Sequence, residues 1–261
     1  MKTLTFQLYS DMHLEFSKKY PHIKPLAKYL FLAGDIGKIN TVNFEPFFDY
    51  CSQHWEKVFY CLGNHEFYHS KKSFSSLKAE YRKLFEKYSN VYLIDDSYIE
   101  FDNIVVLGNP LWSNPSSIYG LNDFNHIRMV TEDIERKYDI RIEQFQQLHK
   151  DCGNYILNEL EKHKNKNIIV MTHFPPTQEN TSSPKYKNQV QYLKDYFASN
   201  FVKNIPDVND IVCWIYGHTH FSNNMDSGKN FKYFSNQMGY LDEMNETNFS
   251  EDGLFTVTLK Y

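Results

Sequence analysis

The sequence predicts an α/β fold in which most strands run parallel and a few run antiparallel. Short apolar runs that are typical of buried strands alternate along the chain with longer segments of helical periodicity. Such alternation indicates strand–helix–strand units, which build a parallel sheet. Two apolar segments on either side of Asp102 and Asn103 also predict a hairpin, so we expect antiparallel strands as well.

Five predicted strands each lead directly into polar residues that can bind a metal ion. The first strand, over residues 3–10, alternates polar and apolar side chains and ends at Asp11. The other four cover residues 29–33, 58–62, 168–171 and 211–215 and lead to Asp35, Asn64, His173 and His218. In a parallel sheet, ligands bind in the crevice outside the carboxyl ends of the strands. We therefore expect these residues to meet at one site.

Two long segments between these strands have the spacing of amphipathic helices. Residues 73–88 form one, and residues 141–164 form the other, with apolar side chains from Ile142 to Leu160 on a single stripe. The remaining predicted strands are expected to be antiparallel and cover residues 98–101, 104–107, 231–234 and 254–259. The result is a mixed architecture rather than a purely parallel one.

The chain has the length and composition of a single domain with one large core. Its 261 residues are near the upper limit for one core, and its 21 Phe and 20 Tyr residues supply ample side-chain area to fill it. We therefore predict one domain over residues 1–261. Residues 113–138 have weak periodicity, and we expect them to form an insertion over the mouth of the site.

The charge pattern and the cysteines restrict the cellular setting and the partners. The 28 basic and 32 acidic residues are mixed along the chain, so no basic surface for an extended nucleic-acid duplex is predicted. The four cysteines form no C-x-x-C pair, and Cys61 and Cys213 fall in apolar runs typical of buried, reduced thiols. No apolar stretch approaches the roughly 20 residues of a membrane span. We expect a cytoplasmic protein with no membrane partner.

The potential metal ligands at the strand ends are two carboxylates, four imidazoles and one amide oxygen. They occur in five short motifs, which are Asp11-Met12-His13, Gly34-Asp35, Gly63-Asn64-His65-Glu66, Thr172-His173 and Gly217-His218-Thr219-His220. Such hard and borderline donors suit manganese, iron or zinc. Together they can hold two ions, and a pair of ions is typical of metal-assisted hydrolysis.

In their order, these motifs resemble the signature of the calcineurin-like metallophosphoesterase superfamily, which is D-x-H, G-D, G-N-H-(D/E), a lone His and G-H-x-H. The resemblance implies a four-layer αββα sandwich with two mixed β-sheets flanked by helices. It also implies two divalent or mixed-valence ions that share Asp35. One ion would be bound by Asp11, His13, Asp35 and His220, and the other by Asp35, Asn64, His173 and His218.

The same resemblance implies hydrolysis of a phosphate ester. A hydroxide that bridges the two ions would attack phosphorus, and His65 would protonate the leaving group or stabilise the transition state. In the phosphoprotein phosphatases of this superfamily the second motif is G-D-x-x-D-R, whereas residues 34–39 of this chain are G-D-I-G-K-I. The residue that orients His65 is therefore open, and a phosphoprotein substrate is disfavoured.

We expect the substrate to be a phosphodiester, or else a phosphomonoester, of a small or nucleotide-like molecule. The chain is similar to a branch of predicted phosphoesterases without a settled substrate. His69, His126 and Arg128 fall in or near loops expected to frame the site and are candidates for binding phosphate. Two alternatives stay open, namely a nuclease acting on short nucleic acid and a binding scaffold that kept the fold without catalysis. The intact ligand positions and His65 disfavour the scaffold.

Overall fold

The computed structural model describes residues 2–69, 71–130, 137–206 and 210–260. In this part of the chain most strands lie in two large mixed sheets. The first has the order β13 (Leu254–Thr258), β1 (Thr3–Tyr9), β2 (Tyr29–Ala33), β3 (Lys57–Cys61), β4 (Val91–Ile94). The second has the order β11 (Met225–Asp226), β12 (Lys232–Phe234), β10 (Ile211–Ile215), β9 (Asn167–Met171), β6 (Ile104–Gly108), β5 (Ser97–Phe101).

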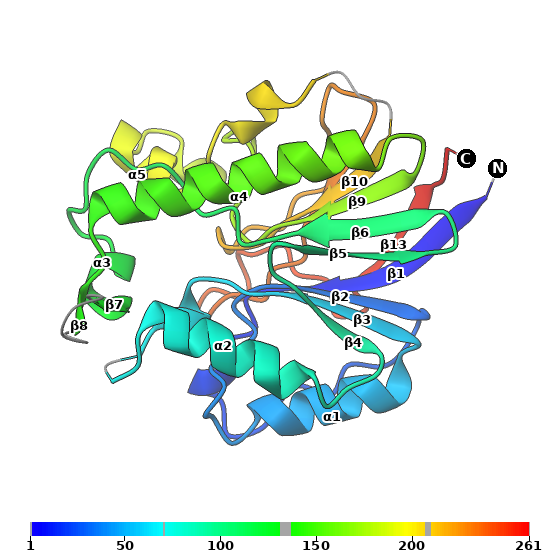
Figure 1. The fold of residues 1–261 in the computed structure, drawn as a ribbon, viewed down its shortest axis with the longest axis horizontal. Coiled ribbons are helices and arrows are strands. Elements are labelled where there is room, and N and C mark those ends of the chain that lie inside the picture. The colour runs from blue at the N-terminus through cyan, green and yellow to red at the C-terminus, as the bar shows by residue number, and fades with distance from the viewer. Residues whose placement is uncertain (1, 70, 131–136, 207–209, 261) are drawn as a thin grey trace.

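The two sheets are stacked, and helices cover the outer face of each (Figure 1). Helices α1 (Phe44–His54) and α2 (Phe74–Phe85) lie against the first sheet, and α4 (Ile142–Lys162) and α5 (Gln191–Phe197) lie on the side of the second. This arrangement is the predicted four-layer αββα sandwich. Short elements occupy the loops, namely η1 (Leu14–Phe16), η2 (His65–Phe67), α3 (Asp123–His126), β7 (Arg128–Val130), β8 (Lys137–Asp139), η3 (Pro184–Tyr186) and η4 (Phe201–Asn204).

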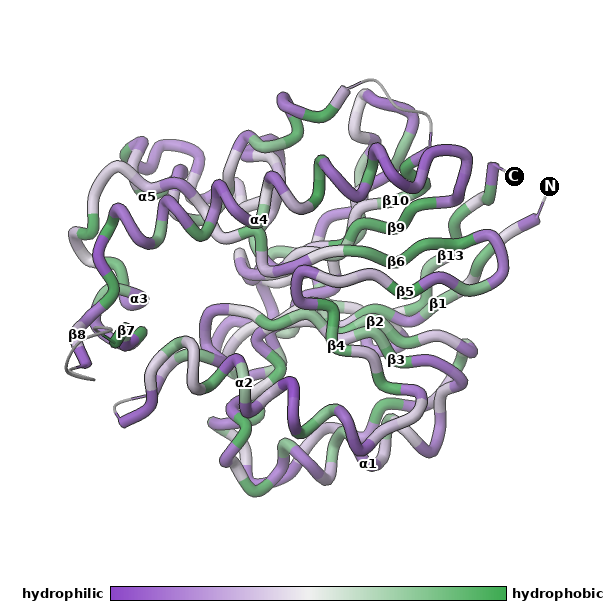
Figure 2. Tube along the Cα trace, viewed as in Figure 1, coloured by the Kyte–Doolittle hydropathy of each residue, from purple (hydrophilic) through white to green (hydrophobic). Residues whose placement is uncertain are grey.

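The central strands are apolar on both faces because each sheet is covered on both sides. In β2, Leu30 and Leu32 belong to the core beneath the helices, whereas Phe31 belongs to the core between the sheets. The ring centroid of Phe31 lies 5.1 Å from that of Phe6 and 4.8 Å from that of Phe59. Figure 2 shows this apolar character along the central strands. Burial on both faces explains why the sequence contains apolar runs rather than strict alternation.

The pairing of β12 differs from the sequence-based expectation. β12 pairs in parallel with β10 and is antiparallel only to the short strand β11. The turn that contains Gly228 (φ 74°) reverses the chain between β11 and β12, so β12 runs in the direction of β10. The prediction that residues 231–234 form an antiparallel strand was therefore wrong for the pairing with β10, which is longer than the pairing with β11. The β5–β6 hairpin and the β13–β1 pair are antiparallel, as predicted.

The four cysteines are free and buried, as predicted for Cys61 and Cys213. Burial raises the pKa of both thiols, so they stay protonated and unreactive at neutral pH. Among the residues that the structure describes, no helix combines the length and apolar character needed to cross a lipid bilayer.

Gly108 at the end of β6 provides a test of the strand packing that positions the site. It pairs with Met171 of β9, and a Cβ atom at Gly108 would overlap the carbonyl oxygen of Met171. We expect Gly108→Ala to lower the free energy of unfolding by about 1 to 3 kcal/mol, because rigid backbone must move apart. Urea denaturation measures this loss, with Thr258→Ala at an exposed position of β13 as the control. Equal stability of the two variants would contradict the prediction.

Candidate metal centre and active site

The potential ligands lie at the carboxyl ends of five strands from both sheets. β1, β2 and β3 run parallel in one sheet, and β9 and β10 run parallel in the other. The loops after these strands carry the predicted ligands and His65 in the order Asp11, His13, Asp35, Asn64, His65, His173, His218 and His220. The two sheets thus bring residues that are up to 209 positions apart into one cluster.

Asp11, His13 and His220 form the first group. One ligand atom from each of the three side chains lies within 4.8 Å of the others. The Nε2 atoms of His13 and His220 are 3.0 Å apart, and Nε2 of His220 is 3.6 Å from Oδ1 of Asp11. These are three of the four residues predicted to bind one ion.

Asp35, His173 and His218 form the second group, within the same 4.8 Å limit. Nε2 of His173 is 3.4 Å from Oδ2 of Asp35. The amide oxygen of Asn64 is 3.0 Å from Nε2 of His173 and 3.1 Å from Nδ1 of His218. The structure therefore assembles all four residues predicted to bind the other ion.

The chemistry of these side chains fits bound cations. In the first group, two imidazole nitrogens face each other although at most one proton can lie between them. A cation between Nε2 of His13 and Nε2 of His220 would be bound by both lone pairs. Nδ1 of His218 and the amide oxygen of Asn64 likewise face each other as two donors to one cation.

Burial and the charges in the cluster decide which protonation state of each side chain is favoured, and therefore whether it is ready to bind metal. Burial alone would raise the pKa of Asp35, but the charges of His173 and His65 hold it well below its usual value. Burial and the charge of His173 lower the pKa of His218. Burial opposes protonation of His173, yet the charge of Asp35 raises its pKa to about 10. A metal ion beside His173 would therefore displace a proton.

Hydrogen bonds to backbone and carboxylate groups fix the rings of two histidines. Nδ1 of His173 is 2.9 Å from the carbonyl oxygen of Ala33, and Nδ1 of His220 is 2.5 Å from Oε2 of Glu243. In each ring a donated Nδ1 proton leaves the Nε2 lone pair directed at the cluster. Such partners are typical of metal-binding histidines.

Asp123 fixes the orientation of the Asn64 amide. The Nδ2 group of Asn64 donates to Oδ1 of Asp123 at 2.8 Å, which turns its oxygen toward His173 and His218. The hydroxyl of Tyr68 donates to the same carboxylate oxygen at 2.5 Å. Asp123 is fully buried and lies within residues 113–138, the segment expected to form an insertion. Residues 131–136 of that segment lie outside the described residues.

The loops at the site have unusual backbone geometry. Five of the predicted ligands have positive φ angles, namely Asp11 (54°), His13 (46°), Asp35 (51°), His218 (78°) and His220 (49°). Non-glycine residues in this region carry strain, which is tolerated where a functional arrangement requires it. The adjacent motif glycines are needed for close approach, because a Cβ atom at Gly63 would overlap the Asp35 carboxylate.

Glu66, the last residue of the G-N-H-E motif, connects two of these loops. Its buried carboxylate accepts hydrogen bonds from the backbone N–H groups of Asp35, Ile36 and Gly63, at 3.1, 2.9 and 2.9 Å. The hydroxyl of Tyr60 donates to it at 2.8 Å. Glu66 therefore holds the loop after β2 against the loop after β3.

His65 lies between Glu15 and Tyr240. Its Nδ1 is 3.1 Å from Oε1 of Glu15, and its Nε2 is 3.2 Å from the hydroxyl oxygen of Tyr240. Burial would lower the pKa of His65, but the charges of Asp35 and Glu15 raise it above the usual value. Burial is outweighed at Glu15 too, where the neighbouring imidazoles of His13 and His65 lower the pKa to about 2.

Glu15 thus contacts His65, the residue whose orienting partner the sequence left open. Sequence analysis missed Glu15, although its position two residues after His13 was a usable signal. It also missed Asp123, Tyr240 and Glu243, for which the sequence contains no comparable signal.

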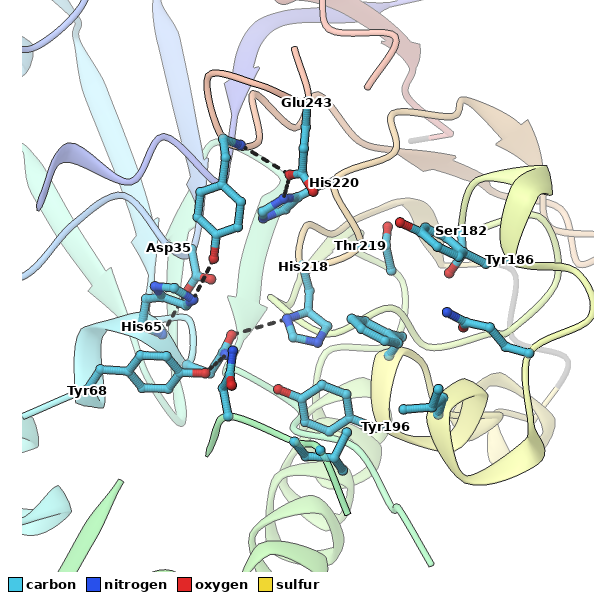
Figure 3. Close-up of a pocket in the computed structure, with 18 residues that line it drawn as sticks. Asp35, His65, Tyr68, Ser182, Tyr186, Tyr196, His218, Thr219, His220 and Glu243 are labelled. Atoms are coloured by element: carbon cyan, nitrogen blue, oxygen red, sulfur yellow. Dashed lines mark hydrogen bonds and ion pairs between the residues drawn. The ribbon is translucent and has the colours of Figure 1, made fainter. Parts of the chain in front are cut away.

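A cavity of about 280 Å³ opens beside the cluster (Figure 3). Asp35, Asn64, His65, His218 and His220 lie along it, together with residues of the 120–122 and 182–197 segments. The three candidate phosphate contacts, His69, His126 and Arg128, do not line this cavity. His126 packs against the ring of Tyr68, and Arg128 pairs with Asp139. His69 accepts hydrogen bonds from the backbone of residues 71 and 72. A role for them in binding phosphate stays a prediction that this geometry does not support.

Comparisons with known proteins agree with this architecture. Residues 5–222 match the family model of the calcineurin-like phosphoesterases. The uncharacterized protein L509 of Acanthamoeba polyphaga mimivirus is 28% identical over 231 residues, which are 84% of this chain and 81% of that protein. The crystal structure of phosphopantetheinyl hydrolase (PptH) from Mycobacterium tuberculosis superposes with a TM-score of 0.65 at 14% identity, and the match covers 97% of this chain and 95% of that one.

The family match covers most of the chain and includes the five strand ends that carry the potential ligands. The solved structure supports the same fold, since its sequence identity is too low to indicate more. The chain belongs to the calcineurin-like phosphoesterase family and is a metal-dependent phosphoric ester hydrolase.

Proposed function

We propose that this protein hydrolyses a phosphodiester, or else a phosphomonoester, of a small nucleotide-like molecule at a centre of two metal ions. The observation that carries the proposal is that two groups of metal-type ligands meet beside one cavity, which Asp35, His65, His218 and His220 line. The donors suit manganese, iron or zinc. The residues proposed as ligands are Asp11, His13, Asp35, Asn64, His173, His218 and His220.

The two ligand sets overlap at Asp35. We assign Asp11, His13, Asp35 and His220 to one ion and Asp35, Asn64, His173 and His218 to the other. When bound, two such ions neutralise charge on phosphoryl oxygens and lower the pKa of water, so that a nucleophile forms at neutral pH. Because Asn64 binds through a neutral amide, only two carboxylates offset the charge of the metals, and a phosphate anion remains favoured.

His65 is the proposed general acid. When Nδ1–H of His65 donates to Glu15, Nε2 of the same ring can carry a second proton and pass it to the oxygen of the leaving group. The carboxylate of Glu15 beside Nδ1 favours the protonated ring that this step needs. The hydroxyl oxygen of Tyr240 lies 3.2 Å from this Nε2 atom.

Glu15 is the proposed positioning residue for His65. We expect Glu15→Gln to lower kcat by about 10- to 100-fold with little change in KM, because the imidazole loses its fixed tautomer and orientation. Steady-state kinetics measure both constants, and Glu86→Gln at an exposed position is the matched control.

The double variant Glu15→Gln/His65→Ala distinguishes this role from a general loss of structure. If Glu15 acts through His65, the double variant should be no slower than His65→Ala alone. Metal content should equal that of the unmodified protein. Losses that multiply, or a fall in bound metal, would place the effect of Glu15 at His13 instead, from which it is 3.6 Å away.

Removal of metal tests the proposed function as a whole. We expect Mn²⁺-dependent hydrolysis of bis-p-nitrophenyl phosphate, complete loss of activity with chelator, and recovery when Mn²⁺ is restored. Bis-p-nitrophenyl phosphate and p-nitrophenyl phosphate, measured side by side, separate diesterase from monoesterase preference. The absence of metal-dependent hydrolysis of either compound would favour the scaffold alternative.

A further inference from the structure

The cavity next to the metal-ligand cluster has an aromatic wall opposite His65. This wall consists of Tyr186 in η3 and of Tyr196 and Phe197 in α5, and Figure 3 shows Tyr186 and Tyr196. The ring centroids of Tyr196 and Phe197 are 5.5 Å and 5.7 Å from that of His218. The wall therefore begins next to the proposed metal ligand His218. The organic part of a phosphate ester bound at the ligand cluster would lie against this wall.

Away from the metal-ligand cluster and His65, no described residue that lines this cavity has a cationic side chain. Among the described residues that line it, none is lysine or arginine, and the acidic ones are Asp35 and Glu243. Nearby Lys185 packs 5.0 Å from the ring centroid of Tyr186 and pairs with Glu246, outside the lining. A second anionic group on the substrate would lose water without gaining a cationic partner, and it would face Glu243.

Neutral polar groups complete the cavity. Asn122, Ser182 and Gln189 line it, and their side chains have no hydrogen bond to another described residue. An amide or hydroxyl group in this position can donate to or accept from the edge of a heterocyclic ring. The aromatic side chains offer faces on which such a ring can stack. At about 280 Å³ the cavity suits one small ligand and not a polymer.

We propose that this cavity binds a flat, uncharged, hydrogen-bonding group, such as a nucleoside, and selects phosphate esters whose only anionic group is the scissile phosphoryl. This inference rests on the proposed function, because it places the phosphoryl group at the ligand cluster. It adds a rule for selecting substrates that hydrolysis itself does not require.

Three diesters with one leaving group test the rule. Methyl p-nitrophenyl phosphate has no ring beyond the leaving group, thymidine 5′-p-nitrophenyl phosphate adds a neutral nucleoside, and its 3′-phosphorylated derivative adds a second anion. We expect kcat/KM for the neutral nucleoside ester to exceed that of each of the others by at least about tenfold. Equal values for all three, or the highest value for the phosphorylated ester, would overturn the inference but leave the phosphodiesterase function intact.

Two substitutions test the two parts of the rule. Phe197→Ala should reduce the preference for the nucleoside ester over the methyl ester by at least about fivefold, because a stacking face is lost. Gln189→Lys should raise kcat/KM for the phosphorylated ester by about tenfold relative to the neutral one, because it supplies the missing cation. Tyr98→Ala, at an exposed position of β5, should change neither ratio. If neither substitution changes its ratio, the cavity does not hold the nucleoside.

A binding measurement separates failure of this inference from failure of the proposed function. Calorimetric titration of the Mn²⁺-loaded protein should show thymidine 5′-monophosphate binding at least about tenfold more tightly than thymidine 3′,5′-bisphosphate. If hydrolysis is absent but this preference holds, the proposed reaction fails and the binding rule stands. Tighter binding of the bisphosphate would refute the rule whatever the activity.

Discussion

Asp35→Asn is expected to lower turnover of a phosphodiester by about 10³-fold or more and to reduce bound metal below two ions per chain. The Asp35 side chain is almost fully buried, and its Oδ1 accepts the backbone N–H of His65 at 2.8 Å. Its Oδ2 lies 3.4 Å from Nε2 of His173. An asparagine fits the same space but removes the negative charge that two cations would share, so electrostatic stabilisation is lost without a gross change in packing.

The measurement is elemental analysis of the purified protein after reconstitution, together with steady-state kinetics. Asp102→Asn is a suitable control, because Asp102 lies in the turn between β5 and β6 at φ 51°, a conformation that asparagine tolerates. The control should keep both its metal content and its activity. Two bound ions and unchanged turnover in Asp35→Asn would refute the role of Asp35 as the shared ligand.

His65→Ala should lower kcat by about 100-fold or more while the metal content stays unchanged. His65 contacts no metal in the proposed scheme, and the Glu15 carboxylate beside its Nδ1 favours the protonated ring. The loss should be larger for esters with alkyl leaving groups than for p-nitrophenyl esters, because a p-nitrophenolate ion leaves without needing a proton. This dependence on the leaving group separates proton transfer from a loss of structure.

His54→Ala, at the exposed end of α1, is the control for this variant. It should retain full activity on every ester. An equal loss for alkyl and aryl esters in His65→Ala would instead indicate that His65 stabilises charge on the phosphoryl group. Full activity of His65→Ala would remove it from the mechanism.

The predicted strands and the clustering of their ligands followed from local sequence. The central strands are buried on both faces, so each leaves an apolar run, and the polar residue that ends each run marks the sheet edge. The prediction of helices over residues 73–88 and 141–164 also agrees with α2 and α4, with shorter ends. Helix α1 was missed although Phe44, Phe47, Phe48 and Cys51 have helical spacing and are buried.

Apart from Glu15, which lies two residues after the first motif, the partners that orient the site were beyond the reach of local sequence. Asp123 lies 59 residues from Asn64 and Tyr240 lies 175 residues from His65 in the chain, and only folding brings each pair within hydrogen-bond distance. Glutamates and tyrosines are common on protein surfaces, so no sequence pattern distinguishes Glu243 and Tyr240 from exposed residues of the same types. The direction of β12 likewise depended on a turn and on its neighbour β10.

The sequence by itself determined the layered α/β architecture, the donor types and their order along the chain, because strand burial and ligand chemistry are properties of short segments. The tertiary structure alone decided which carboxylate faces His65 and how the amide of Asn64 is turned. It also decided that an aromatic cavity adjoins the cluster, with no lysine or arginine among the described residues that line it. The reason is that contacts between distant segments depend on how the two sheets pack, and no short segment of the sequence shows that packing.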